Sequence, residues 1–496
     1  MTSQCDQSTM NINSPFLYSP KKGWVNDPNG LVYVDGIYHL FYQYNPTSNV
    51  PNNICWGHAN SKDLVKWQDK GVAIYYQEDL TEQIFSGSAV IDNTNSTGLC
   101  DLSIPVVAYY TSQYKKAATL PDGSKVAADT QAQTMAYSCD RGDIWQTSHV
   151  PTIREPPSKY ASEFKNFRDP NLVWYQPHKK WIMTLVMSDV PRAIWYASEN
   201  LLNWTFAGEF GSQNAPQGQW ECPALMEFPV QNAKETKWVL VISTNPGGLR
   251  RASGMYYFVG HFNGFTFKAD ENQQDIKWFD YGADCYAGIF WSNLPGKQKY
   301  MSMWIDNWEY GPKIGNKYKG GIAHREVSLV KVDNAYKLFQ APIQQLEKYV
   351  QKVYNLTKLL LKIGIKIFKN EAHRISMVIK GANESDFSFV IEDEKKRLLV
   401  KIYFIHKDNT VCVQRRKPDS DEKEQFENHC AELIVTTELK MEMLIDNFTV
   451  TLYLKDGECV FTEILPFCNE KRKFRLLFGF HKIRILQAKQ MILANP

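Results

Sequence analysis

Long apolar runs are missing from this 496-residue chain, so it holds no 18-residue segment that would cross a membrane as a helix. Long basic stretches interleaved with aromatic residues are missing too, and the formal net charge is only +3, which speaks against a nucleic-acid-binding protein. None of the ten cysteines belongs to a C-x-x-C pair, which argues against a zinc ribbon or a thioredoxin-like site. We therefore expect no membrane or nucleic-acid partner, and no metal or cofactor.

The N-terminal residues predict no leader segment within this sequence. The first seven residues, Met-Thr-Ser-Gln-Cys-Asp-Gln, are polar and do not contain the apolar core of a signal peptide. We expect an extracellular protein if a leader was removed from this sequence, and a cytoplasmic protein otherwise. The even number of cysteines permits disulfides but does not require them in a chain of this size.

Helical periodicity is scarce in the first 340 residues, where short β-rich runs alternate with turn residues. Residues 32–34 and 38–44 flank Asp35-Gly36, a pair that supplies the positive φ angles of a tight hairpin. The segment Ser-Lys-Asp-Leu-Val-Lys-Trp at 61–67 recurs loosely at 138–145 and 198–204, and more faintly at 263–267. This spacing fits one four-stranded sheet with its loops, so the repeat predicts an all-β fold of the β-propeller type.

The texture of the chain changes after residue 339. Residues 342–369 contain few turn residues, which suits a short linking helix or a crossing strand. From about residue 370 apolar and charged residues alternate in several runs, which is typical of a β-sandwich. We expect a propeller domain over residues 1–340, a linker over 341–369 and a C-terminal β-sandwich over 370–496.

Three acidic residues stand in unusual local settings. Asp27 and Asp169 are each followed directly by proline, and Glu221 has a proline two residues on. Proline fixes its own φ and biases the preceding residue toward extended backbone, so these carboxyl groups are held on stiff chain. Catalytic groups need such fixed placement, because small displacements cost rate.

Two carboxyl groups in different protonation states are what retaining glycoside hydrolysis requires. Glu221 lies between Trp220 and Cys222, and this apolar setting favours the protonated acid. Asp27 has amide side chains close by in sequence, which favours the ionised nucleophile. Asp169 follows Arg168 and is expected to stay ionised, where it could bind hydroxyls and stabilise positive charge in the transition state.

These motifs resemble those of glycoside hydrolase family 32, the β-fructofuranosidases that include invertases, exo-inulinases and levanases. The resemblance rests on Trp-Val-Asn-Asp-Pro-Asn-Gly at 24–30, Phe-Arg-Asp-Pro at 167–170 and Trp-Glu-Cys-Pro at 220–223. It extends from about residue 16 to residue 325, and it is greatest toward fungal exo-inulinases and invertases. It implies a five-bladed propeller with the active site at its centre, followed by a β-sandwich.

The resemblance also implies roles for individual residues. Asp27 would be the nucleophile, Asp169 the transition-state stabiliser and Glu221 the acid/base. The fructose pocket would be lined by Asn26, Gln43, Trp56, Phe85, Ser86, Arg168 and Trp308, with the tryptophans offering stacking faces. Residues 319–329 match the family only loosely, and Thr451 stands in the sandwich where an acidic residue is usual.

The sequence leaves three functions open. The first is an exo-acting hydrolase that removes terminal fructose from sucrose or fructans such as inulin. The second is a fructosyltransferase on the same scaffold, because loops rather than carboxylates choose the acceptor. The third is a non-catalytic sugar-binding propeller, which the presence of all three acids disfavours.

The high aromatic content, 13% of residues, suits a sugar cleft and a large all-β core equally. A homodimer through the sandwich is a further expectation.

Overall fold

The computed structural model describes residues 12–211, 214–249, 252–270, 276–357, 365–367, 371–393, 395–418, 426–465, 472–477 and 483–496. These residues are mostly in strands, and one short α-helix, α1 (Gly311–Ile314), is found among them. Short 3-10 helices span Ser158–Glu163, Gln176–His178, Gln344–Tyr349, His406–Asp408 and Lys455–Gly457. The expected all-β class is therefore confirmed.

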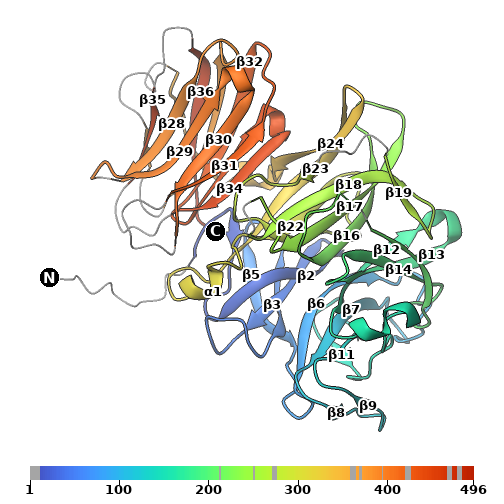
Figure 1. The fold of residues 1–496 in the computed structure, drawn as a ribbon. Coiled ribbons are helices and arrows are strands. Elements are labelled where there is room, and N and C mark those ends of the chain that lie inside the picture. Colours follow the sequence, from blue (N-terminus) through green and yellow to red (C-terminus); the bar gives the residue numbers. More distant parts are fainter. Residues whose placement is uncertain are drawn as a thin grey trace.

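Antiparallel sheets of four or five strands dominate the described residues from 12 to 342 (Figure 1). The first contains β2 (Trp24–Val34), β3 (Ile37–Asn45), β4 (Cys55–Ser61) and β5 (Trp67–Ile74). The second contains β6 (Glu82–Ile91), β7 (Val106–Tyr114), β10 (Gln131–Ser138) and β11 (Gln146–Thr147). The third contains β12 (Phe167–Tyr175), β13 (Lys180–Met187), β14 (Arg192–Ser198) and β15 (Thr205–Phe210).

Two further sheets follow in sequence. The fourth contains β16 (Gln219–Pro229), β17 (Thr236–Asn245), β18 (Gly254–Phe262), β19 (Phe267–Ala269) and β20 (Lys277–Trp278). The last contains β21 (Tyr286–Phe290), β22 (Lys299–Trp304), β23 (Ile322–Val332), β24 (Ala335–Pro342) and the N-terminal β1 (Leu17–Tyr18). A separate small hairpin joins β8 (Ala118–Thr119) to β9 (Lys125–Val126). Because β1 comes from the other end of this part of the chain, its pairing with β23 ties the first and last sheets together.

One strand of each sheet faces the middle of the assembly. These inner strands are β2, β6, β12, β16 and β21, and each contacts the next, while β21 contacts β2. A backbone bridge between Val32 and Ser292 and a hydrogen bond from the Ser292 hydroxyl to the Ala89 carbonyl at 2.8 Å hold the ring together. The predicted propeller architecture is thus present, with its apolar cores lying between neighbouring sheets.

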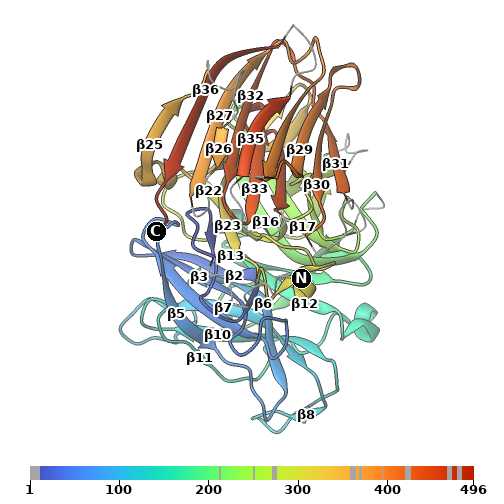
Figure 2. The same ribbon diagram turned by 90° about the vertical axis from the view of Figure 1, so that its left-hand side faces the viewer.

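The C-terminal part consists of two six-stranded sheets (Figures 1 and 2). One contains β25 (Val350–Asn355), β36 (Arg484–Leu493), β27 (Ala372–Lys380), β32 (Glu438–Ile445), β33 (Thr449–Leu454) and β34 (Cys459–Ile464). The other contains β26 (Ile365–Ile367), β35 (Arg472–Leu477), β28 (Phe387–Asp393), β29 (Leu398–Ile405), β30 (Thr410–Arg416) and β31 (Phe426–Glu432). Their apolar faces enclose one buried core, so the predicted β-sandwich is confirmed.

The turns read from the sequence are found where they were expected. Asp35 and Gly36 have φ angles of 45° and 89° and join β2 to β3. The repeated segment joins the third strand of its sheet to the fourth in each of its three clear copies. In each copy the indole N–H donates to a nearby backbone oxygen: Trp67 to Leu64, Trp145 to Gly142 and Trp204 to Leu201. The repeat therefore marks one turn type at equivalent places.

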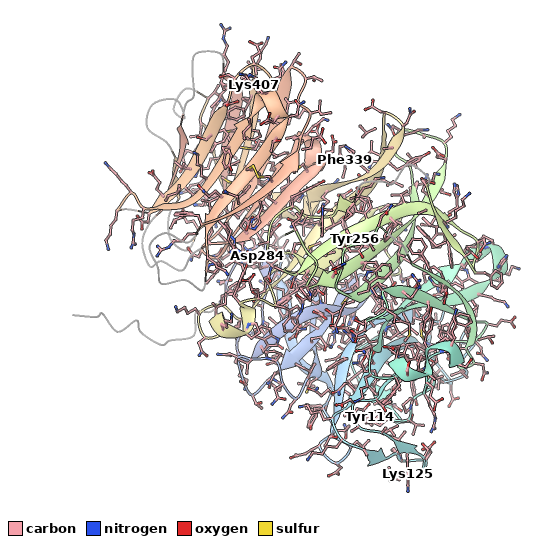
Figure 3. The ribbon with its side chains drawn as sticks, in the orientation of Figure 1. Tyr114, Lys125, Tyr256, Asp284, Phe339 and Lys407 are labelled. Atoms are coloured by element: carbon pink, nitrogen blue, oxygen red, sulfur yellow. A yellow bond between two sulfur atoms is a disulfide. The ribbon has the colours of Figure 1, made fainter. Side chains whose placement is uncertain are left out.

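Residues 280–284 pair with β34 of the sandwich and so connect the two parts of the chain. The Tyr281 N–H donates to the Val460 carbonyl at 2.8 Å, and the Thr462 N–H donates to Asp280 Oδ1 at 2.9 Å. Gly282 is needed for this approach, because a Cβ there would lie 2.2 Å from the Thr462 carbonyl oxygen. Asp284, which ends the segment, lies where the sandwich meets the ring of sheets (Figure 3).

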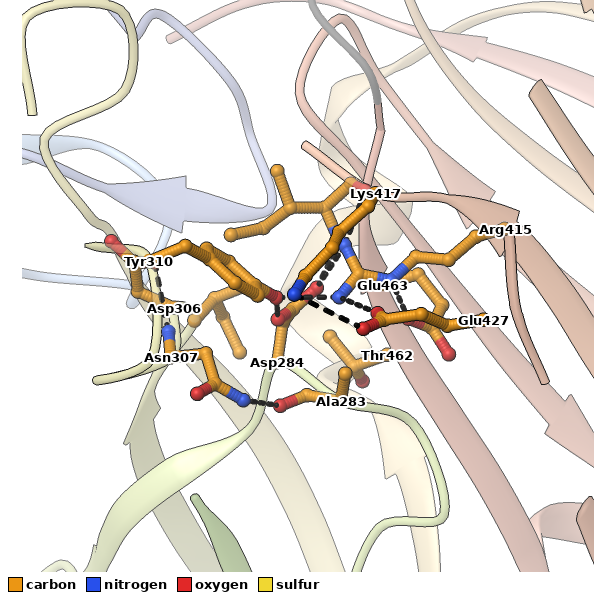
Figure 4. Close-up of polar contacts among 12 residues, drawn as sticks. Ala283, Asp284, Asp306, Asn307, Tyr310, Arg415, Lys417, Glu427, Thr462 and Glu463 are labelled. Carbon is orange, nitrogen blue, oxygen red and sulfur yellow. Dashed lines mark hydrogen bonds and ion pairs between the residues drawn. The ribbon is translucent and has the colours of Figure 1, made fainter. Parts of the chain in front are cut away.

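A buried charge cluster completes this interface (Figure 4). The fully buried guanidinium of Arg415 pairs with Asp284 at 3.3 Å, with Glu463 at 2.8 Å and with Glu427 at 3.2 Å. It also donates to the Tyr310 hydroxyl at 2.6 Å. Burial raises the pKa of Asp284 to about 7, although the charge of Arg415 opposes this shift.

Arg415→Met should destabilise the protein by about 3–5 kcal/mol, because it leaves buried carboxylates without their cation. The pKa of Asp284 is about 7 in the folded protein and about 4 in the unfolded chain. The free energy of unfolding therefore falls as the pH rises from about 4 through 7. The loss of Arg415 enlarges that fall, so the destabilisation should be greater at pH 8 than at pH 5. Thermal and urea unfolding at both pH values measure it.

Lys417→Met is the matched control, since it removes a neighbouring cation that pairs with the more exposed Glu309 at 2.6 Å. Its effect should stay below about 1 kcal/mol. Equal losses in the two variants, or a larger loss for Arg415→Met at pH 5, would contradict a stabilising role for the Arg415 cluster.

Candidate active site

Every inner strand carries an extra residue near its beginning, β2 has a second one between Asn29 and Val32, and the three acids lie at the bulges near the strand beginnings. At each bulge an advance of three residues along the inner strand pairs with an advance of only two residues along the neighbouring strand. The shifts fall between Val25 and Pro28, Ile84 and Gly87, Arg168 and Asn171, Glu221 and Ala224, and Tyr286 and Ile289. A bulge interrupts the alternation of side chains and re-aims the residues within it.

Asp27 is the second residue of the first bulge. Its Oδ1 accepts a hydrogen bond from Asn26 Nδ2 at 3.0 Å, and its Oδ2 accepts one from the Ser86 hydroxyl at 2.8 Å. Asn26 is itself held by the indole of Trp24, which donates to its Oδ1 at 2.8 Å. Burial, and then the charge of Glu221, raise the pKa of Asp27, while these hydrogen bonds lower it in part.

Asp169 is the first residue of its bulge and has a left-handed backbone, with φ at 63°. Its Oδ2 accepts a hydrogen bond from the Cys222 N–H at 2.8 Å, and its own N–H donates to the Thr111 hydroxyl at 2.9 Å. Burial raises the pKa of Asp169 to about 7, although Arg168 opposes the shift. Burial thus opposes the ionised form that we expect for Asp169 beside Arg168.

Glu221 directly precedes its bulge and is held by two donors. Arg168 Nη2 donates to Oε1 at 3.0 Å, and the Tyr286 hydroxyl donates to Oε2 at 2.5 Å. The apolar setting expected for Glu221 is not found. Trp220, its neighbour in sequence, points to the opposite face of the strand and into the core between two sheets. The Glu221 side chain is 23% exposed, so a ligand can reach it.

Cys222 links the three acids. Its N–H donates to Asp169, its thiol lies 3.5 Å from Asp27 Oδ2, and it adjoins Glu221 in the chain. Burial, followed by the charges of these acids, raises the pKa of its thiol well above the usual range, so the thiol donates rather than ionises. The predicted Asp27, Asp169 and Glu221 are thus brought together from three different sheets.

The other predicted residues on the first two sheets surround Asp27. Gln43 is buried and donates from Nε2 to the Ile84 carbonyl at 2.9 Å. Trp56 is fully buried, and its indole donates to the Phe85 carbonyl at 3.0 Å. The stacking face expected of Trp56 is therefore absent in this structure. Both side chains instead bind consecutive backbone carbonyls, those of Ile84 and Phe85. They thereby fix the backbone that carries the half-buried Phe85 and leads into Ser86.

Trp308 lies after β22 and is partly exposed. Its ring centroid is 5.0 Å from that of Trp304 and 6.2 Å from that of Trp24, whose indole holds Asn26. The Trp308 N–H donates to the Ser253 hydroxyl at 3.1 Å. Trp308 therefore joins the site through an aromatic cluster beside Asn26.

Tyr286 is the functional side chain that sequence reasoning missed. It is fully buried, and the charge of Glu221 adds to burial in raising the pKa of its phenol well above the usual range. No motif surrounds it in the sequence. Its position relative to the bulge equals that of Glu221 on the preceding inner strand, so a correct alignment of the sheets could have indicated it.

No group of three or more His, Cys, Asp or Glu side chains in the described ranges could hold a metal ion. In that same part of the chain no helix has the length and apolar character needed to span a membrane. The polar groups of the site are thus carboxyl groups, amides, hydroxyls, one thiol and the guanidinium of Arg168.

Comparisons with known proteins agree with this arrangement. The extracellular exo-inulinase of Aspergillus niger is 41% identical over 342 residues, which are 66% of this chain and 64% of that enzyme. The levanase of Bacillus subtilis is 33% identical over 467 residues, covering 91% of this chain and 66% of the levanase. The matches therefore span slightly less than two thirds of the length of these curated relatives.

Solved structures match over almost the whole chain. The exo-inulinase from Aspergillus awamori has a TM-score of 0.87 and 30% identity, covering 97% of this chain and 98% of that one. A fructofuranosidase from Schwanniomyces occidentalis, complexed with fructosylnystose, has a TM-score of 0.83 and 26% identity, covering 99% of both chains.

The family models give the same assignment. The model of the glycosyl hydrolases family 32 N-terminal domain matches residues 18–342, and that of the family 32 C-terminal domain matches residues 343–476. Together they account for both the ring of sheets and most of the sandwich. The chain belongs to glycosyl hydrolase family 32.

Proposed function

We propose that this chain is a retaining, exo-acting β-fructofuranosidase that hydrolyses terminal non-reducing fructosyl residues of sucrose and of fructans such as inulin. The observation that carries the proposal is the convergence of Asp27, Asp169 and Glu221, from three different sheets, around Cys222. Asp27 accepts from Asn26 and Ser86, whereas Glu221 is held by Arg168 and Tyr286. Family membership and the activities named for the exo-inulinase and levanase relatives support it.

In the proposed first step a carboxylate oxygen of Asp27 forms a bond to the anomeric carbon of the fructosyl residue. The bond from that carbon to the leaving oxygen breaks, and Glu221 gives its proton to this oxygen. In the second step Glu221 takes a proton from water, which attacks the same carbon and frees Asp27. Asp169 stabilises the positive charge that develops on the sugar.

The remaining predicted residues bind the fructosyl unit in this proposal. Asn26, Ser86 and Arg168 supply donors beside the carboxyl groups, and Trp308 and Phe85 supply apolar surface. Gln43 and Trp56 act through the backbone that they hold. These are direct contacts to one terminal sugar, which suits attack at a chain end.

A fructosyltransferase remains the second candidate function, because the same covalent intermediate could pass to a sugar. The names of the relatives favour hydrolysis over transfer. A non-catalytic sugar-binding propeller is disfavoured, since a lectin has no need of all three acids, Asp27, Asp169 and Glu221.

We also propose that the five inner strands correspond to five propeller blades within residues 1–340, that residues 341–369 lead into the sandwich, and that residues 370–496 form it. The repeated bulge supports the blade count, and the boundary of the family matches at residue 342 supports the division. An extracellular location is supported by the disulfides Cys100–Cys139 and Cys412–Cys430. A homodimer through the sandwich stays a prediction for gel filtration.

Product analysis tests the proposed activity. With sucrose the chain should release glucose and fructose in equal amounts, and with inulin it should release fructose as the main product from the first minutes, without intermediate oligosaccharides. Asp27→Asn should keep the fold and lose turnover to below roughly a hundredth, because an amide cannot attack the anomeric carbon. Chromatography of the products and circular dichroism of the variant measure both.

Two outcomes would contradict this scheme. Trisaccharides accompanied by excess free glucose would mean transfer rather than hydrolysis. Activity of Asp27→Asn above roughly a hundredth of wild type would remove Asp27 from the role of nucleophile.

Glu221→Ala should harm substrates according to their leaving group. Sucrose needs a proton on its leaving oxygen, so its hydrolysis should fall by a large factor, whereas fructosyl fluoride needs little help in the first step. The second step then lacks its base, and the intermediate on Asp27 should accumulate. Azide, which needs no base, should restore turnover as fructosyl azide, measured by mass spectrometry.

Equal losses on sucrose and fructosyl fluoride without azide rescue would mean that another residue is the acid. Asp169 would then be the first candidate, because burial raises its pKa to about 7.

Ser86→Ala should change the pH dependence of the reaction. The Ser86 hydroxyl stabilises the Asp27 carboxylate, so its loss raises the pKa of Asp27 further and moves the acid limb of the pH profile to higher pH. We expect roughly a tenfold loss of kcat/KM at the acid end and less than about threefold at the plateau. Ser86→Thr keeps the hydroxyl, so its acid limb should lie at the wild-type pH. A loss of kcat/KM in Ser86→Ala that is equal at all pH values would exclude stabilisation of the Asp27 carboxylate by Ser86.

A further inference from the structure

A second cavity, of about 560 Å³, lies at the other end of the inner strands. Its wall includes the last residues of β6 and β12, Glu227 near the end of β16, and residues that follow β21. Glu227 is six residues beyond Glu221 on the same strand, which corresponds to roughly 20 Å of extended chain. The cavity is therefore separate from the carboxyl groups and takes no part in the proposed reaction.

Two tryptophans give this cavity an aromatic wall. Trp174 on β12 and Trp181 on β13 are direct cross-strand partners, and their rings meet at a steep angle with centroids 5.1 Å apart. Trp174 is 39% exposed, yet its indole N–H donates to Gln176 Oε1 at 2.7 Å, which fixes the orientation of the ring. The wall thus presents a flat apolar face that is already oriented for a ligand.

The polar part of the wall is balanced in charge. Glu199 pairs with Lys180 at 3.5 Å. Burial lowers the pKa of Lys299, and the charge of the exposed Glu227 opposes that shift, so these two groups also compensate each other. Most other polar groups on the wall are amides and hydroxyls, such as Asn93. This set suits a neutral ligand rich in hydroxyl groups better than an ion.

We propose that this cavity is a second binding site for a short segment of a β-fructan chain. Sugar C–H faces stack on the indole of Trp174, and hydroxyls bond to the amides and to Glu227. The volume lies within the range of roughly 300–1,000 Å³ usual for ligand pockets. The substrate class rests on the proposed function, whereas the existence of a neutral, hydroxyl-binding cavity does not.

A second site would act on polymers alone. Binding one part of a long fructan at this cavity raises the effective concentration of its chain ends near Asp27 and Glu221. Sucrose has two sugar units and cannot bridge sites separated by roughly 20 Å. The cavity should therefore lower KM for long fructans and leave sucrose hydrolysis unchanged.

Trp174→Ala should reduce kcat/KM on long-chain inulin roughly three- to tenfold through a higher KM, with sucrose kinetics unchanged. Phe206→Ala is the matched control, because Phe206 on β15 is 38% exposed and does not line the cavity. Glu227→Gln is a second, isosteric variant at the wall and should act in the same direction. Melting curves establish whether each variant is folded. If the Trp174→Ala protein does not fold, the kinetics of the Glu227→Gln protein decide the test.

Binding without turnover separates this proposal from the proposed function. The Asp27→Asn protein should be retained on insoluble long-chain fructan. Adding Trp174→Ala or Glu227→Gln to this protein should weaken its retention, whereas adding Phe206→Ala should not. Unchanged retention, or equal losses on sucrose and inulin, would overturn the second site. A wild-type chain that cleaves neither sucrose nor inulin would overturn the proposed function, and the retention assay would still report on the cavity.

Discussion

An extra residue near the beginning of every inner strand is the constraint on which the candidate active site depends. An undisturbed strand sends successive side chains to opposite faces, so neighbouring residues could not serve one site. The bulge breaks this rule at every inner strand. Glu221 precedes its bulge, Asp169 is the first bulge residue and Asp27 the second. Three different positions of one repeated irregularity thus bring carboxyl groups from three sheets together.

Placing these acids together has an electrostatic cost that the site does not fully compensate. Burial raises the pKa of both Asp27 and Asp169, and the charge of Glu221 adds to each shift. The one guanidinium at hand, that of Arg168, forms its ion pair with Glu221. Such strain persists only where the surrounding structure holds it, and here a closed ring of hydrogen-bonded sheets does so. The charge of Glu221 therefore disfavours the ionised form of both aspartates.

The sequence revealed what depends on local chemistry and concealed what depends on distant contacts. Asp35-Gly36 and the repeated turn before Trp67 are local, so the all-β class could be predicted from them. The stiff settings of Asp27 and Asp169 next to proline are also local. The surroundings of Glu221 are not, because Trp220 beside it in sequence faces another core, while Tyr286 comes from the next inner strand.

The sandwich also bears on the site, through chain segments that the two parts share. Asp284, which pairs with Arg415 of the sandwich, lies two residues before Tyr286, whose hydroxyl holds Glu221. Asn307 donates to the Ala283 carbonyl at 2.7 Å and directly precedes Trp308. The sandwich thus anchors the segment before Tyr286 through Asp284, and it holds the segment of Trp308 through the hydrogen bond from Arg415 to the Tyr310 hydroxyl. The ring supplies the bulges, and the sandwich fixes the starting point of the inner strand that delivers Tyr286.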